Sequence, residues 1–155
     1  MVLFLPRDAV SVPVSRQVLD RCLETLGVTP DTRADIALAL SEACANVIQH
    51  AGPGDEYEVQ VRARDRRCAI EVINTGSRDG ASVLDSFTAA DEPVPVTAEH
   101  GRGLKIIDAV TDNLELTGDG GQGTTVHFEK TLEWLPGAPG QQLFAGDHNG
   151  ERPGR

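Results

Sequence analysis

Three side chains that could bind a metal or move a proton are spaced four residues apart in one segment. The stretch DIALALSEACANVIQHA, residues 35–51, carries Glu42, Asn46 and His50. Because positions four apart are neighbours on an α-helix, this spacing stacks a carboxylate, an amide and an imidazole. A carboxylate can serve as a general base, and an amide oxygen is a neutral ligand for a hard cation. A solvated polar face is the alternative, and other segments must decide.

The apolar residues of this segment predict a helix packed on a core. They recur at helical spacing on the side away from the polar row: Ile36, Leu40, Ala43 and Val47. Asp31 or Thr32 is suited to cap the start of this helix, and GPG at 52–54 to end it. The helix is therefore expected to run to about Ala51.

The preceding stretch, SVPVSRQVLDRCLETLGV, predicts another helix. Ser11 is the expected N-cap and Gly27 the expected stop. Three apolar residues at helical spacing are expected to face the core: Val18, Cys22 and Leu26. With Cys44 and Cys68, Cys22 is interpreted as a reduced core thiol, since no CxxC pair indicates zinc or redox chemistry.

Alternation of apolar and polar residues predicts the strands. VLFL near the start is a short strand, and YEVQVRA and CAIEVIN form a hairpin around RDRR. A further strand is expected at NLELT, and a last one at TTVHFEKTL after the glycine turn GDGGQG. The order of elements predicts an α+β two-layer sandwich, with helices on one face of a mixed, mostly antiparallel sheet.

Two glycine motifs flank the predicted helix GLKIIDAVTD and the last strand. In EHGRGLKII, Gly101 and Gly103 are expected just before the helix, where backbone N–H groups could receive phosphate oxygens. GQGTTVHFEK is a glycine turn that enters a strand. Either motif alone is weak, because ordinary helix starts and hairpin turns also use glycine.

Composition and charge bound the class of protein. The 155 residues and 39% hydrophobic content suit one domain, expected at 1–135, with a flexible Pro/Gly-rich tail at 136–155. Residues 75–100 are rich in Gly, Pro, Ser and Asp and are interpreted as a lid. The net charge of -10 argues against direct binding to nucleic acid or anionic lipid. No apolar run reaches the roughly 20 residues that a membrane span requires, so we do not expect one. The expected location is the cytoplasm.

The order of these motifs resembles the Bergerat-fold ATPases. An ExxxN helix is followed by a strand that ends in a Gly turn, a lid, GxGL at a helix and a GTT strand. Within that superfamily the chain is most similar to the anti-sigma-factor serine kinases. Four segments carry this resemblance, which covers roughly Leu3 to Leu132: LPRDAVSVPVSR, LALSEACANVIQHA, GRGLKII and GTTVHFEK.

The resemblance implies ATP and Mg²⁺ as cofactors and gives each motif a role. Glu42 matches the general base, and Asn46 the magnesium ligand. The second glycine box corresponds to a run of four residues: Gly101, Arg102, Gly103 and Leu104. Thr124 and Thr125 match the closing element near the adenine pocket, although a cross-strand threonine is the structural alternative. Arg102 and Lys105 could meet phosphate, and a solvated role is the alternative. His50 is assigned to helix-end hydrogen bonding or packing rather than to catalysis.

The first glycine box departs from the family's pattern. Its usual form is aspartate, any residue, glycine, any residue, glycine, whereas here Asn74 and Gly76 are followed by Arg78 at the last position. Asn74 can present an amide oxygen to the adenine amino group, although a charged acceptor is stronger by about 1 kcal/mol. Arg78 places a long cation where backbone must approach the nucleotide, so either it turns outward toward phosphate or the pocket is degenerate.

Two functions from different classes follow. The first is an anti-sigma factor and serine/threonine kinase, a homodimer that binds a sigma factor and phosphorylates a STAS-domain anti-sigma-factor antagonist. The second is a protein-binding switch that keeps the fold and has lost catalysis. Glu42 and Asn46 favour the first, whereas Asn74 and Arg78 favour the second.

Overall fold

The computed structural model describes residues 1–50, 55–74, 101–118 and 124–145. The predicted lid, Gly76 and Arg78 lie outside the described residues, as does the side chain of His50. The elements follow in this order: β1 (Val2–Pro6), α1 (Ser11–Leu26), α2 (Pro30–His50), β2 (Glu56–Arg64), β3 (Arg67–Asn74), α3 (Gly101–Val110), β4 (Asn113–Gly118), β5 (Thr124–Thr131) and α4 (Pro139–Leu143).

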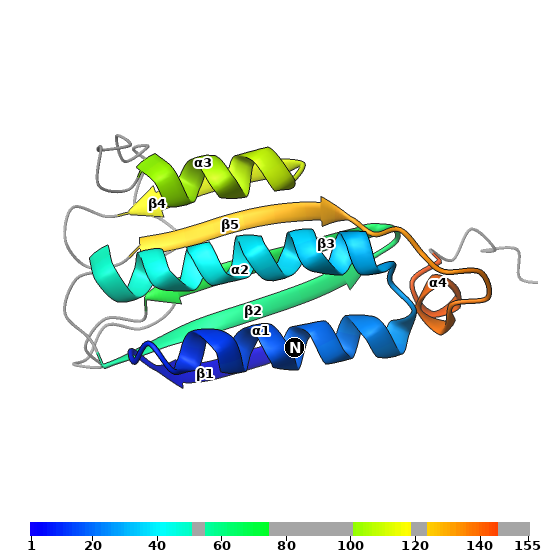
Figure 1. Cartoon of the computed structure of the whole chain (residues 1–155), viewed down its shortest axis with the longest axis horizontal. Coiled ribbons are helices and arrows are strands. Elements are labelled where there is room, and N and C mark those ends of the chain that lie inside the picture. The colour runs from blue at the N-terminus through cyan, green and yellow to red at the C-terminus, as the bar shows by residue number, and fades with distance from the viewer. Residues whose placement is uncertain (51–54, 75–100, 119–123, 146–155) are drawn as a thin grey trace, which may run out of the picture.

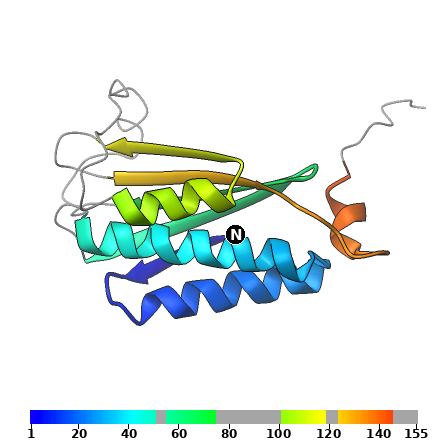
Figure 2. The same cartoon turned by 45° about the horizontal axis from the view of Figure 1, so that its top comes forward.

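The five strands form one sheet in the order β1-β2-β3-β5-β4. Every pairing among the described strands is antiparallel. The predicted mostly antiparallel sheet is therefore confirmed, and no parallel pair is present among these strands. Helices α1, α2 and α3 lie side by side over one face of the sheet (Figures 1 and 2). The two-layer α+β sandwich predicted from the order of elements is therefore confirmed.

The face of the sheet under the helices is set by the alternation of its strands. The inward residues of β2, β3 and β5 are at most 8% exposed: Tyr57, Val59, Val61, Cys68, Ile70, Val72, Val126 and Phe128. Asp65, with φ 55°, lies in the turn between β2 and β3, whose register pairs Arg64 with Arg67. This register sets Tyr57 directly opposite Asn74, on the buried face.

Helix α1 turns a different face inward than its sequence suggested. Its buried residues are Ser11, Ser15, Leu19 and Leu23. The prediction for Val18 and Cys22 was wrong, since Val18 is 37% exposed and Cys22 is exposed. Ser11 begins the helix rather than capping it, and its hydroxyl lies 2.6 Å from the hydroxyl of Tyr57. The buried face of α1 contains two serines, whose hydroxyls find hydrogen-bond partners inside the protein, so a search for apolar residues does not identify this face.

Helix α2 begins before both expected capping residues, at Pro30. A proline is well suited to the first position, where a missing N–H costs no helical hydrogen bond. The hydroxyl of Thr29 donates to the hydroxyl of Thr32 at 3.0 Å, which joins the residue before the helix to its first turn. The helix ends at His50, within one residue of the prediction.

The short helix α4 was not foreseen by the prediction of a flexible tail from residue 136. Ala138 is 4% exposed, and the ring of Phe144 stacks on Trp134 with centroids 6.4 Å apart. A Cβ at Gly140 would clash with the Trp134 ring, so this close packing requires glycine. A few well-packed residues therefore hold 136–145 against the domain despite their Pro- and Gly-rich composition.

The three cysteines differ in exposure, which predicts their reactivity. Cys44 and Cys68 are buried, whereas Cys22 is exposed. Burial raises the pKa of the Cys44 thiol to about 11 and also raises the pKa of Cys68. Since the thiolate is the nucleophile, we expect an aromatic disulfide reagent at pH 8 to label one thiol in the folded protein and three after unfolding. Cys22→Ser should abolish the native signal; rapid labelling of two or more thiols would contradict the buried positions.

Candidate functional site

Most of the predicted site residues gather at one end of the sandwich. The end of α2 and the starts of α3 and β5 lie at the left end of the view in Figure 1. The pairing of Ile73 with Thr125 brings the end of β3 to the start of β5. Segments far apart in sequence thus contribute to one region.

The row on α2 has the geometry that its spacing predicted. The helix is continuous from Pro30 to His50, so Glu42 and Asn46 lie one turn apart. Glu42 is half-buried, whereas Asn46 is only 8% exposed. The opposite side packs in the core: Ile36, Leu40, Ala43 and Val47 are at most 1% exposed. A rigid helix therefore presents a carboxylate and a buried amide side by side.

Gly103 brings α3 against the carboxylate of Glu42. A Cβ at residue 103 would lie 3.1 Å from Oε2 of Glu42, which is tighter than ordinary contact. The helix begins at Gly101, so the glycines lie in its first turn rather than before it as predicted. First-turn N–H groups have no partner within the helix, which leaves them able to bind an anion. Gly103 of the glycine box therefore lies against the α2 residue Glu42.

Gly103→Ala is expected to disturb catalysis more than binding. The added methyl must push the Glu42 carboxylate aside by a few tenths of an ångström. The resemblance implies that Glu42 is the general base of phosphoryl transfer. Because misplacement of a catalytic group by 1 Å can cost about 100-fold, kcat for that transfer is then expected to fall about tenfold. The affinity for ATP should change less than kcat. Asp108→Ala is the control, because this exposed residue lies on the same helix beyond the glycine box; equal losses in both variants would contradict the close approach.

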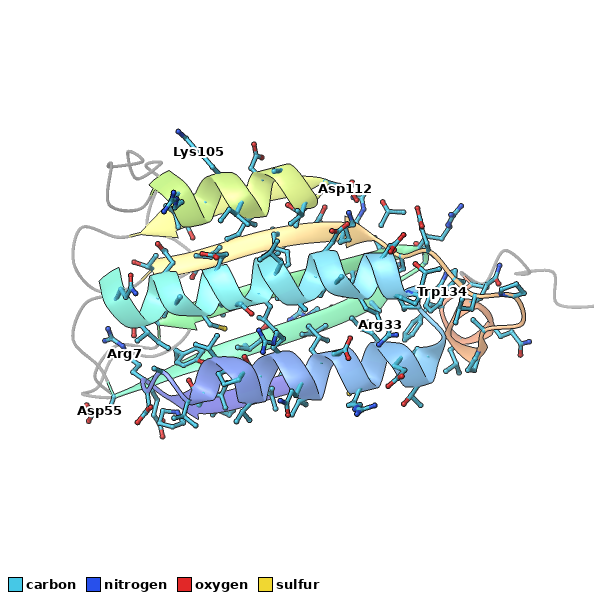
Figure 3. All side chains as sticks on the ribbon, viewed as in Figure 1. Arg7, Arg33, Asp55, Lys105, Asp112 and Trp134 are labelled. Carbon is cyan, nitrogen blue, oxygen red and sulfur yellow. The ribbon has the colours of Figure 1, made fainter. Side chains whose placement is uncertain are left out.

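The other residues of the second glycine box divide between surface and core. Arg102 is exposed, and Lys105 projects from the side of α3 that faces away from α2 (Figure 3). Leu104 is 4% exposed and belongs to the hydrophobic core. The position of Leu104 is therefore explained by packing, whereas the phosphate role of Arg102 stays a prediction.

Asn74 lies at the end of β3 on the face that α2 covers. It is 4% exposed and directly opposite Tyr57, whose own side chain is fully buried. Burial of the Tyr57 hydroxyl raises its pKa, so the ring remains neutral at physiological pH. Tyr57 was missed as a neighbour of the candidate site, although the hairpin register around Asp65 already sets it beside Asn74.

The two threonines of the GTT strand lie on opposite faces of the sheet. Thr124 alternates with Val126 and Phe128, which face the helices, whereas Thr125 alternates with His127 on the open face. On the open face, Nδ1 of His127 lies 3.1 Å from Glu71. Only Thr124 therefore shares the face of Asn74, and Thr125 is a cross-strand partner of Thr117.

The donor set fits a magnesium ion that is shared with a nucleotide. No group of three or more His, Cys, Asp or Glu side chains that could hold a metal exists among the described residues. Mg²⁺ does not require such a cage, because it keeps several waters and uses one or two protein ligands with substrate phosphates. The buried amide of Asn46, one turn from Glu42, is a ligand of the kind that such a shared ion uses. Among the described helices, none is long and apolar enough to cross a membrane.

The fold and this arrangement define an α+β sandwich of the Bergerat class. Residues 5–130 match the family model of the histidine kinase-like ATPase domain. Because this match spans most of the chain, the chain belongs to the histidine kinase-like ATPase domain family.

Three curated relatives are named serine-protein kinase RsbW. They come from Bacillus mycoides (strain KBAB4), Bacillus cereus (strain G9842) and Bacillus anthracis, and each is 28% identical over 134 residues. Each alignment covers 83% of this chain and 82% of the relative. The crystal structure of the RsbU and RsbW domains of Rv1364c from Mycobacterium tuberculosis has a similar fold, with a TM-score of 0.60 and 20% identity. That match covers 85% of this chain, which spans 32% of the solved one.

Proposed function

We propose that this chain is an anti-sigma factor and an ATP-dependent serine/threonine kinase. It binds a sigma factor and phosphorylates a STAS-domain antagonist on serine, as a homodimer in the cytoplasm. The observation that carries the proposal is the contact between Gly103 and Glu42, which unites the helix of Glu42 and Asn46 with the glycine box. Similarity to serine-protein kinases over 83% of the chain supports it.

Each proposed role suits the chemistry of its side chain. MgATP supplies the γ-phosphoryl group when it is bound. Asn46 would hold the magnesium ion through its amide oxygen, and Asn74 would accept a hydrogen bond from the adenine amino group. Glu42 would accept the proton of the substrate serine hydroxyl, a role that requires a carboxylate at the edge of the site. The half-buried position of Glu42 leaves it within reach of a protein substrate.

The net charge favours a particular kind of partner. With 24 acidic against 14 basic residues, the chain attracts basic surfaces and repels nucleic acid. A basic region of a sigma factor is a complementary partner, and such complementarity raises association rates more than affinity. Direct contact with DNA is not part of the proposal.

A second function, a switch that binds proteins without catalysis, is favoured by Asn74 and Arg78, the two departures from the first glycine box. Asn74 stands where the resemblance implies an aspartate, which removes the charged acceptor for adenine. Under this alternative the chain still binds its sigma factor, but no phosphate is transferred.

An assay for transfer of labelled phosphate distinguishes the two functions. The purified chain is mixed with MgATP labelled at the γ-phosphate and, one at a time, with purified STAS-domain antagonists from its source organism. The kinase transfers label to serine of one antagonist, whereas the switch transfers none. Binding to purified sigma factors is measured by calorimetry in the same preparation, and absence of both transfer and binding would contradict both functions.

A further inference from the structure

Arg7 joins three parts of the chain at the end of the molecule that carries the site. Its Nη2 donates to the carbonyl of Ile48 at 2.8 Å and to that of Val47 at 3.4 Å. Its backbone N–H donates to the carbonyl of Asp55 at 2.8 Å, just before β2. Figure 3 shows Arg7 beside the end of α2, with Asp55 nearby. Arg7 thus connects the β1–α1 turn to the last turn of α2 and to the start of β2.

The two carbonyls that Arg7 contacts are among the last four of α2. Such carbonyls have no hydrogen-bond partner within the helix, so an outside donor stabilises them. A cation at this end also interacts favourably with the helix dipole. The guanidinium suits this role, because it keeps its charge and carries several fixed donors. Val47 and Ile48 directly follow Asn46, so the hydrogen bonds from Arg7 fix the backbone next to the residue that carries the amide.

The β1–α1 turn that carries Arg7 is itself fixed by hydrogen bonds. The N–H of Asp8 donates to the carbonyl of Pro6 at 2.8 Å, and the N–H of Ser11 donates to the carbonyl of Asp8 at 2.9 Å. The carboxylate of Asp8 accepts the N–H of Val10 at 2.9 Å. The guanidinium therefore holds α2 from a rigid anchor.

We infer that Arg7 is a positioning residue for Asn46. It holds the last turn of α2 so that the amide keeps the orientation in which it receives a magnesium ion. Arg7 acts through the α2 backbone. The inference rests on the proposed function, since it assigns Asn46 to the metal of MgATP.

The test compares Arg7→Ala and Arg7→Lys with Arg21→Ala. Arg21 is an exposed arginine of α1 whose ion pair with Glu24, at 2.8 Å, lies on the surface, so its removal makes the same charge change. ATP affinity is measured with magnesium and with a chelator, well below the Tm of each variant. Because supporting partners of metal ligands are worth about 10- to 100-fold in metal affinity, we expect Arg7→Ala to weaken MgATP binding about tenfold. Affinity for metal-free ATP should hardly change, Arg7→Lys should recover part of the loss, and Arg21→Ala should lose nothing.

Amide hydrogen exchange in the nucleotide-free protein separates the possible failures. Arg7→Ala should speed exchange in the last turn of α2, and Arg21→Ala should not. Unchanged exchange there, or an equal loss of affinity with and without magnesium, would overturn the inference about Arg7. A wild-type protein that binds ATP without regard to magnesium would instead refute the metal role in the proposed function.

Discussion

Replacing Glu42 with Ala is expected to lower kcat for phosphoryl transfer by about 10²- to 10⁴-fold, the usual contribution of a general base. ATP affinity should stay within about twofold, because the carboxylate acts on the serine hydroxyl rather than on the nucleotide. Single-turnover transfer of labelled phosphate gives the first quantity, and equilibrium titration gives the second.

Glu133→Ala is the matched control for Glu42→Ala. Glu133 is an exposed glutamate just beyond the end of β5, whereas the candidate site lies at the start of that strand. Its loss should leave transfer and binding unchanged. Full transfer activity in Glu42→Ala would refute the assigned role of Glu42, even if the protein proved to be a kinase.

Asn46→Ala is expected to remove the magnesium dependence of ATP affinity. If the amide–magnesium bond is worth as much as a hydrogen bond to a charged group, about 1.5–3 kcal/mol, the affinity for MgATP should fall about 10- to 100-fold toward that for free ATP. Titrations with magnesium and with a chelator measure both values. Asn46 is buried, so a thermal melt is needed to show that the variant folds.

Gln49→Ala serves as the control for Asn46→Ala. Gln49 is an exposed amide on the same helix, three residues further on. It should retain the magnesium dependence of the wild type. If Asn46→Ala folds and keeps the full dependence, the metal is not held by Asn46.

Features with strong periodicity could be predicted from the sequence. The α2 row and the hairpin each depend on local spacing, and both appear as expected. The core face of α1 could not be predicted, because two sets of residues share the four-residue spacing and the buried set contains two serines. Hydroxyl groups with internal partners, such as Ser11 with Tyr57, look polar in sequence and are core in the structure.

Contacts between distant segments could not be predicted from the sequence. Gly103 and Glu42 belong to different helices, and only the packing of α3 on α2 shows that a side chain at 103 would press on Glu42. Arg7 contacts carbonyls 40 and 41 positions along the chain, and a backbone acceptor leaves no signal in a side-chain pattern. Alternation in β5 separates Thr124 from Thr125, whereas the GTT motif as a unit does not distinguish them.

The central claim is that Glu42, Asn46 and the first turn of α3 form the wall of an ATP site. The most direct test is an equilibrium titration of the purified wild-type protein with ATP, in the presence and absence of magnesium, without any partner. Our account predicts saturable binding that is tighter with magnesium. Absence of binding up to millimolar ATP would contradict it and would favour the switch that binds proteins without catalysis.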